Sequence, residues 1–215
     1  MTALTFDSLI TGPFNREAVA SARVVADRPA KGVNPLLLVG ASGTGKSHIL
    51  RVIKTESTNR QADLLATETS TEALIQECVD ACWAETTDTL FKGMRETTDL
   101  LLLDHLEILA NRPATAFTLL EEMGFMVEGG MQIVLVCTPS AAASIGLPKW
   151  VATFPCGHTV ILRKPDQDAL RRFVLMEASL LGVELQPDDL DDATAATTIF
   201  PEARGCLNRL SLTVG

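Results

Sequence analysis

Short runs of apolar residues alternate with stretches of helical spacing along much of the chain. Three runs are continuous: LLLV at 36–39, LLLL at 100–103 and QIVLVC at 132–137. We expect a further strand around 63–67 and a last one at 157–162. Continuous apolar strands that alternate with helices are typical of a parallel sheet covered by helices on both faces. The pattern therefore predicts an α/β fold.

Helical spacing fills most of the intervals between these strands. We expect helices at about 15–28, at 47–54 with a polar break at 56–59, twice within 70–95, and at 114–127. The predicted buried positions are Ala73, Leu74, Val79, Cys82 and Trp83 within 70–95, and Phe117, Leu120, Met123, Phe125 and Met126 within 114–127. Packing is also the preferred interpretation for Trp150.

The chain contains only helical patterns after Lys164-Pro165-Asp166. The predicted helices cover 167–181, about 187–197 and 201–212, and the first carries a stripe of Leu170, Phe173, Val174 and Leu181. Such a stripe is typical of a helix that packs into a core. We therefore divide the chain into an α/β domain at 1–165 and a small helical subdomain at 166–215.

The segment GASGTGKS at 40–47 matches the phosphate-binding loop G-x-x-x-x-G-K-[ST] between a predicted strand and a predicted helix. Glycines allow successive backbone N–H groups to turn toward a phosphate, and the following helix presents its N-terminus to the same anion. We expect Lys46 to reach the β- and γ-phosphates and Ser47 to ligate Mg²⁺ of bound ATP or ADP. The candidate nucleotide-binding residues of this segment are Gly40, Ser42, Gly43, Thr44, Gly45, Lys46, Ser47 and the adjacent His48, for which a structural role is the alternative.

A carboxylate follows the second apolar strand directly, at Asp104. An acid in that position can hold the water shell of a Mg²⁺ ion beside a phosphate loop. The carboxyl ends of parallel strands meet at one edge of the sheet, where ligands bind in such folds. We therefore expect Gly40, Asp104 and Thr138 to border one crevice.

Composition limits the partners of the chain. The formal charge is −9 over 215 residues, and 70–96 holds six acids against two bases, which disfavours binding to the nucleic-acid backbone. The chain has five cysteines, of which Cys78 and Cys82 are one helical turn apart, but no second Cys/His pair follows at a metal-site spacing. We therefore expect reduced thiols that pack as small apolar residues. With no signal peptide or membrane-spanning run predicted, we expect a cytoplasmic protein.

Five ordered segments resemble a known family: LTFDSLITGPFNREA, VNPLLLVGASGTGKSHIL, DLLLLDHLEIL, QIVLVC and GCLNRL. They resemble the AAA+ core of DnaA/Hda-type proteins over residues 3–212, without the DNA-binding domain of DnaA, and the short relative Hda is the most similar. The resemblance implies a five-stranded parallel sheet with a helical lid, Asn15 near the adenine pocket, and regulation of replication initiation by docking on AAA+ partners.

The sequence departs from the family at positions that act in hydrolysis. His105 stands where a second acid often polarises the attacking water, so it is a candidate proton acceptor, although a neutral structural histidine is the favoured alternative. Glu107 is another candidate, but we expect a residue two positions further on to point elsewhere. Thr138 replaces an Asp or Asn and can still hydrogen-bond a phosphate or water.

Two arginines expected from the family are also missing. Thr153 occupies the position of the arginine finger, with Lys149 four residues away, and Pro201 occupies the position of the lid arginine. Arg204, about one turn further on, is the candidate that could reach the phosphates. The resemblance therefore implies ATP or ADP binding with slow or absent hydrolysis by the isolated chain.

Three functional hypotheses remain. The first is a nucleotide-dependent regulator that docks on a DnaA-like AAA+ partner or on itself. The second is a helicase-loader or transposition-helper ATPase acting on single-stranded DNA, which would need basic residues around 70–95. The third is a diverged scaffold whose nucleotide only stabilises the fold.

Overall fold

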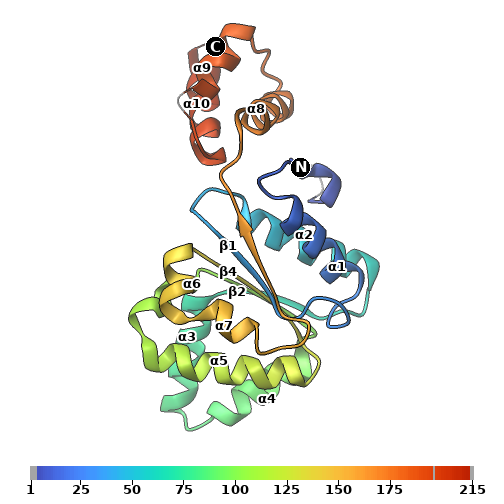
Figure 1. The fold of residues 1–215 in the computed structure, drawn as a ribbon, viewed down its shortest axis with the longest axis vertical. Coiled ribbons are helices and arrows are strands. Elements are labelled where there is room, and N and C mark those ends of the chain that lie inside the picture. The colour runs from blue at the N-terminus through green and yellow to red at the C-terminus, as the bar shows by residue number, and fades with distance from the viewer. Residues whose placement is uncertain (1–3, 196, 214–215) are drawn as a thin grey trace.

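A computed structural model describes residues 4–195 and 197–213, and it centres on one five-stranded parallel sheet (Figure 1). The spatial order of the strands is β2-β3-β4-β1-β5. The strands are β1 (Leu36–Gly40), β2 (Ala66–Ser70), β3 (Leu100–Asp104), β4 (Gln132–Cys137) and β5 (His158–Leu162). The predicted α/β architecture is confirmed.

The three central strands are buried on both faces, which explains their continuous apolar sequences. Alternate residues of β1, β3 and β4 enter two separate cores. One core contains residues of α1 (Arg16–Asp27) and α2 (Lys46–Arg60). The other contains residues of α3 (Thr71–Trp83), α4 (Thr87–Thr97), α5 (Pro113–Glu128), α6 (Pro139–Ile145) and α7 (Leu147–Val151).

Two predicted boundaries near the sheet edge are wrong. The helix that follows the phosphate loop continues to Arg60, because Ser57 is fully buried and the Thr58 hydroxyl donates to the Lys54 carbonyl at 3.0 Å. The strand expected around 63–67 lies instead at Ala66–Ser70. All five of its residues are half-buried, so this edge strand has no apolar run that would mark it.

Several side chains expected in the core are exposed. Trp83 is 86% exposed and Phe117 is 68% exposed, because α3 and α5 turn other residues inward. The exposed members of the predicted set also include Ala73, Val79, Cys82 and Phe125, whereas Leu74, Met123 and Met126 are buried. Cys156 is exposed as well. Trp150 packs as expected, with its indole N–H donating to the Leu120 carbonyl at 3.1 Å.

Three helices follow the sheet: α8 (Gln167–Leu181), α9 (Pro187–Ala195) and α10 (Phe200–Thr213). Figure 1 shows them grouped at one end of the molecule. The Asp166 carboxylate caps α8 by accepting from the Ala169 N–H at 2.8 Å. These helices share a small core that contains Leu170, Phe173 and Val174, while Leu181 is exposed. The division at residue 165 falls in the segment between β5 and α8 and remains a prediction.

The described helices include none long and apolar enough to cross a membrane. A 3₁₀ turn (Phe6–Ser8) precedes α1, and a second one (Leu106–Asn111) follows β3. The second turn carries the residues after Asp104 back toward the cleft described below.

A buried polar network joins the segment before β1 to the start of β4. The Asn34 side-chain oxygen accepts from the Ile133 N–H at 3.0 Å and from the Gln132 amide at 3.2 Å. Its amide donates to the Met131 carbonyl at 2.9 Å. The Gln132 side-chain oxygen accepts from the Ala30 N–H at 2.8 Å. These bonds fix the entry of two adjacent central strands.

We predict that Asn34→Ala lowers the free energy of unfolding by about 1–3 kcal/mol, because buried groups of β4 lose their partner. Urea denaturation of the two proteins measures the difference. Asn59→Ala, at an exposed position of α2, is the matched control and should change stability by less than about 0.5 kcal/mol. Equal stabilities for Asn34→Ala and the native chain would contradict the structural role of the network.

A phosphate-loop cleft as the candidate functional site

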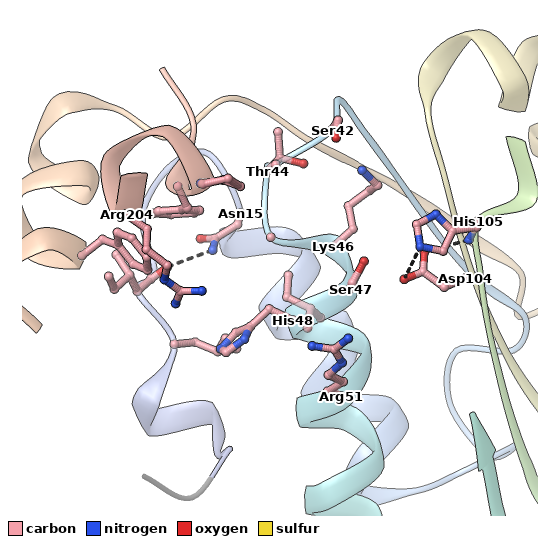
Figure 2. Close-up of a pocket in the computed structure, with 18 of the residues that line it drawn as sticks. Asn15, Ser42, Thr44, Lys46, Ser47, His48, Arg51, Asp104, His105 and Arg204 are labelled. Carbon is pink, nitrogen blue, oxygen red and sulfur yellow. Dashed lines mark hydrogen bonds and ion pairs between the residues drawn. The ribbon is translucent and has the colours of Figure 1, made fainter. Parts of the chain in front are cut away.

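A cleft of about 1120 Å³ lies where the carboxyl ends of β1, β3 and β4 meet the C-terminal helices. Residues of the phosphate loop, Asp104 and Thr138 all line it, as the sequence predicts. Figure 2 shows Ser47 opposite Asp104 and the Lys46 amino group near Ser42, with Asn15 and Arg204 on the other side of the loop. Gly40, expected at the same crevice, is not one of the described residues that line the cleft, and a Cβ added to it would come within 2.8 Å of the Thr44 hydroxyl.

The loop has the backbone that its glycines make possible. Gly43 and Gly45 have φ angles of 76° and 94°, a region that side chains disfavour. The Thr44 hydroxyl, almost fully buried, donates to the Ala41 carbonyl at 2.8 Å. Helix α2 begins at Lys46, so its free N–H groups face the cleft, and Ser42 and Ser47 line the same wall. The arrangement fits the phosphates of a nucleotide.

Lys46 is the central cation of the cleft. Its side chain donates to the Ala41 carbonyl at 2.8 Å, and the residue is only 7% exposed. Burial lowers the pKa of Lys46, while the carboxylates of Glu107 and Asp104 oppose that shift. A phosphate would add negative charge beside this ammonium and favour its protonated form.

Asp104 ends β3 with its carboxylate at the cleft. One oxygen accepts from the His105 N–H at 2.8 Å, and the backbone carbonyl accepts from the Thr71 hydroxyl at 2.8 Å. The second oxygen lies 3.9 Å from the His105 imidazole. Ser47 lines the same cleft, so an oxygen ligand set for Mg²⁺ can form from Ser47, waters near Asp104 and phosphates. The described residues form no cluster of three His, Cys, Asp or Glu that would hold a metal alone.

Glu107 differs from its sequence interpretation, and His105 lines the cleft beside Asp104. His105 has a left-handed backbone at φ 61° and a side chain that is 73% exposed, so it is not a core residue. Glu107 lines the cleft rather than pointing elsewhere, because the 3₁₀ turn after β3 brings it back. Its Oε2 atom is buried and has no hydrogen-bond partner among the described residues. A second carboxylate besides Asp104 therefore lies near Lys46.

Thr138 lies between β4 and α6 and lines the cleft. Its hydroxyl lies 3.3 Å from that of Ser140 and can reorient toward a ligand. Cys137, directly before it, is buried, and burial raises the pKa of this thiol to about 12. Cys137 is therefore a packed thiol and no nucleophile at neutral pH.

The opposite end of the cleft is mainly apolar. Leu9, Ile10, Phe173, Met176 and Phe200 line it. Asn15 lies beside them, but its amide is already used: it donates to the Ile10 carbonyl at 2.9 Å and accepts from the Gly12 N–H at 3.0 Å. Asn15 thus shapes the loop that forms this wall.

The start of α10 packs directly on the phosphate loop. A Cβ added at Gly43 would lie 2.7 Å from Ile199 and 3.2 Å from the Pro201 ring. Pro201 therefore makes an apolar contact at the loop and offers no charge to a phosphate.

Arg204 is held by an acid of α8. Its guanidinium donates two hydrogen bonds of 2.8 Å to Glu177 and lies 5.3 Å above the Phe173 ring. Figure 2 places Arg204 across the loop from Asp104, on the side of His48 and Arg51. Burial lowers the pKa of His48, and the charges of Arg51 and Arg204 lower it further, against Glu177.

Sequence reasoning missed several cleft residues. Glu177, Met176 and Phe200 come from α8 and the start of α10, and Arg51 and Glu72 come from α2 and α3. Nothing in their spacing marks them, because they reach the cleft through packing between elements far apart in the chain. Only Arg51, one helical turn after Ser47 and His48, lay close enough to the phosphate loop to be found.

The parallel sheet with strand order β2-β3-β4-β1-β5, the phosphate loop after β1 and the helical lid define a P-loop NTPase fold of the AAA+ class. A family model described as "Bacterial DnaA ATPAse domain" matches residues 1–147. The chain belongs to this family.

Curated relatives named "Chromosomal replication initiator protein DnaA" align over nearly the whole chain. The protein from Thermomicrobium roseum is 27% identical over 208 residues, which cover 96% of this chain and 44% of the relative. The protein from Francisella tularensis subsp. novicida is 29% identical over 211 residues, which cover 97% of this chain and 43% of the relative. The chain thus spans less than half the length of these relatives.

Solved structures share the fold. Domain III of the Thermotoga maritima initiator DnaA superposes with a TM-score of 0.82 at 21% identity, covering 98% of this chain and 88% of that one. AMPPCP-bound DnaA from Aquifex aeolicus gives 0.80 at 20% identity, covering 97% and 64%. The DnaC helicase loader gives 0.56 at 14% identity, covering 74% and 96%.

The charges around His48 predict opposite effects for two variants. Arg204→Ala should raise the pKa of His48, because a cation is lost, and Glu177→Gln should lower it, because an anion is lost. NMR titration of the imidazole protons measures both shifts. His158, which pairs with Glu17 on another part of the surface, is the internal control.

Shifts of the same sign in the two variants would contradict this arrangement.

Because the pKa of His48 in the folded chain lies below its ordinary value, the stability of the fold depends on pH. In the range between the folded and unfolded pKa values the unfolded chain binds the proton more readily, so the folded state loses stability as the pH falls from neutrality through that range.

Proposed function

We propose that this chain is a nucleotide-dependent regulator of the DnaA/Hda type, which binds ATP or ADP with Mg²⁺ and docks on an AAA+ partner. The isolated chain hydrolyses ATP slowly or not at all. The observation that carries the proposal is a complete phosphate-binding loop beside a depleted set of hydrolytic residues.

The phosphate loop supports the binding half of this proposal. A buried ammonium on Lys46, two left-handed glycines and the free N-terminus of α2 converge on one wall of the cleft. Lys46 would pair with the β- and γ-phosphates, while Ser47 and Asp104 would hold the Mg²⁺ ion and its waters. The Aquifex aeolicus relative described as AMPPCP-bound has the same fold.

The apolar wall gives a place for the nucleobase, and Asn15 keeps that wall in position through its two hydrogen bonds. Arg204 belongs to this side. We infer that it can contact the nucleotide while it stays paired with Glu177, because only two of its five N–H groups are occupied there. The lid would then respond to occupancy of the cleft through one charged pair.

The hydrolytic side of the cleft is weaker. His105 is exposed and carries no negative charge when neutral, so it orients water poorly. Glu107 is the group that we assign to this task, since the residue lines the cleft near Lys46 and its buried Oε2 atom has no hydrogen-bond partner among the described residues. A rotation of the side chain would bring that oxygen to the water. Thr138 would hydrogen-bond the γ-phosphate or the water. Without a positive charge from outside, these groups give slow turnover.

The docking half of the proposal follows from an asymmetry in the chain. Its cleft could receive an arginine from a partner, but its own Thr153 is an exposed hydroxyl on the segment that should present one. The chain would therefore act in a DnaA-like assembly, or with a second copy, without supplying the arginine that triggers hydrolysis in its neighbour. An arginine of this kind contributes about 10³–10⁵ in rate.

Direct action on DNA is the competing function. A relative described as replication initiator DnaA bound to AMPPCP and single-stranded DNA shares the fold. In this chain α3 and α4 carry a net negative charge, which repels phosphates. No observation on the described residues favours the DNA-acting role.

Calorimetric titration with MgATP and MgADP tests the proposed binding. Lys46→Ala should weaken both affinities by at least about tenfold, because the loss of a charged hydrogen bond costs about 1.5–3 kcal/mol. Lys54→Ala removes a half-exposed lysine of the same helix that pairs with Glu68, and it should bind like the native chain. Equal affinities for native and Lys46→Ala proteins would contradict the proposal.

A further inference from the structure

The most exposed large apolar side chain of the described residues lies on α3, far from the lid. Trp83 is 86% exposed at the end of this helix, and Val79, one turn earlier, is 42% exposed. The spacing i, i+4 places both on the same face, together with Asp80. Thr71, Leu74 and Ile75 face the core, so this outer face has no packing partner within the described chain.

The same helix pair carries an excess of carboxylates. The acids of α3, α4 and the turn between them are Glu72, Glu77, Asp80, Glu85, Asp88 and Glu96. The two bases are already paired, Lys92 with Glu96 at 3.8 Å and Arg95 with Glu122 at 3.3 Å. Among the described residues the other five acids have no ion-pair partner. Trp83 is therefore an apolar anchor on a helix pair with excess negative charge, and it shares its face with Asp80, which accepts a hydrogen bond of 2.8 Å from the Gln76 amide.

The exposed indole of Trp83 and the acidic residues of α3 and α4 indicate the chemistry of a partner that could bind here. An indole ring attracts a guanidinium or ammonium group over its face, and nearby carboxylates strengthen that attraction. Tryptophan and arginine are also the residues most enriched among binding hot spots. A nucleic-acid strand could stack a base on the indole, but its phosphates would meet Asp80 and the net negative charge of α3 and α4.

Helix α3 is also connected to the nucleotide cleft. At its start the Thr71 hydroxyl donates to the Asp104 carbonyl at 2.8 Å, and Glu72 lines the cleft. At about 1.5 Å per residue, Glu72 and Trp83 are roughly 16 Å apart along one rigid helix. Figure 1 places α3 on the side of the sheet away from α1 and α2. A partner on the outer face of α3 would therefore leave the cleft open.

We propose that the outer face of α3, with Trp83 as its anchor, docks a basic protein segment whose arginines stack on the indole and pair with Asp80 and its acidic neighbours. This inference deepens the proposed docking role by naming the surface and the chemistry of its partner. It stands apart from nucleotide binding, because the residues of the face lie outside the phosphate loop.

The test uses the full chain and a defined probe, a short amphipathic peptide of arginine and leucine. Calorimetric titration should give measurable binding to the native chain. Trp83→Ala and Asp80→Lys should each weaken it by at least about tenfold, because an aromatic anchor or a paired charge is lost. Phe117→Ala is the matched control: it removes a 68% exposed aromatic ring from another helix, and it should bind the peptide like the native chain.

Two further ligands test whether the outer face of α3 prefers a basic peptide over other ligands. A peptide with glutamate in place of arginine and an oligothymidylate should show no binding that depends on Trp83. The inference is overturned by any of four results: no binding of the basic peptide, equal loss in Trp83→Ala and Phe117→Ala, equal binding of the acidic peptide, or Trp83-dependent binding of the oligonucleotide. Unchanged MgATP affinity in Trp83→Ala would show that the nucleotide site is intact, so failure of either proposal is recognised by itself.

Discussion

The register of the parallel sheet is the constraint on which the cleft depends. Val39 is paired with Cys137, and Leu103 is paired with Leu135, so the ends of β1, β3 and β4 lie side by side. A phosphate loop, a carboxylate and a hydroxyl that are distant in the chain thereby border one cleft. Burial of the apolar strands on both faces fixes that register, because a shift of one residue would turn every side chain to the opposite face.

The cleft combines a complete phosphate loop with several positions that depart from the family pattern. Burial disfavours the charged form of Lys46 and the carboxylates of Glu107 and Asp104 favour it, so an anionic ligand would add to the stabilisation of the ammonium. At the side of Asp104, by contrast, the next residue is an exposed histidine that lines the cleft, and Glu107 has one buried oxygen without a hydrogen-bond partner among the described residues. At the lid, Pro201 gives an apolar contact and Arg204 is held by Glu177.

The fold was largely predictable from sequence, because continuous apolar runs mark strands that are buried on both faces. The phosphate loop was predictable for a different reason: its backbone geometry needs particular residues at fixed spacing. The edge strand β2 was misplaced, since ATETS is half-buried and has no apolar run. Trp83 and Phe117 were placed in the core because spacing alone does not say which face of a helix meets the sheet.

The cleft was harder to predict beyond the loop and Asp104. Glu107 enters it through a 3₁₀ turn that residue spacing does not reveal, and Arg204 meets Glu177 from a helix 27 residues away in the chain. Asn15 was associated with the adenine pocket by resemblance, and its actual contacts are with the backbone of the wall. Contacts between distant elements have no local sequence signature.

Single-turnover hydrolysis tests the central claim most directly. The purified chain, in excess over MgATP, would be quenched at intervals and the bound nucleotide analysed. We predict that bound ATP is converted to ADP with a rate constant below about 10⁻³ s⁻¹, comparable with other P-loop proteins that lack an arginine finger. A rate constant above that value would mean that His105, Glu107 or another group completes the catalytic site, and it would contradict a cleft built for binding rather than turnover.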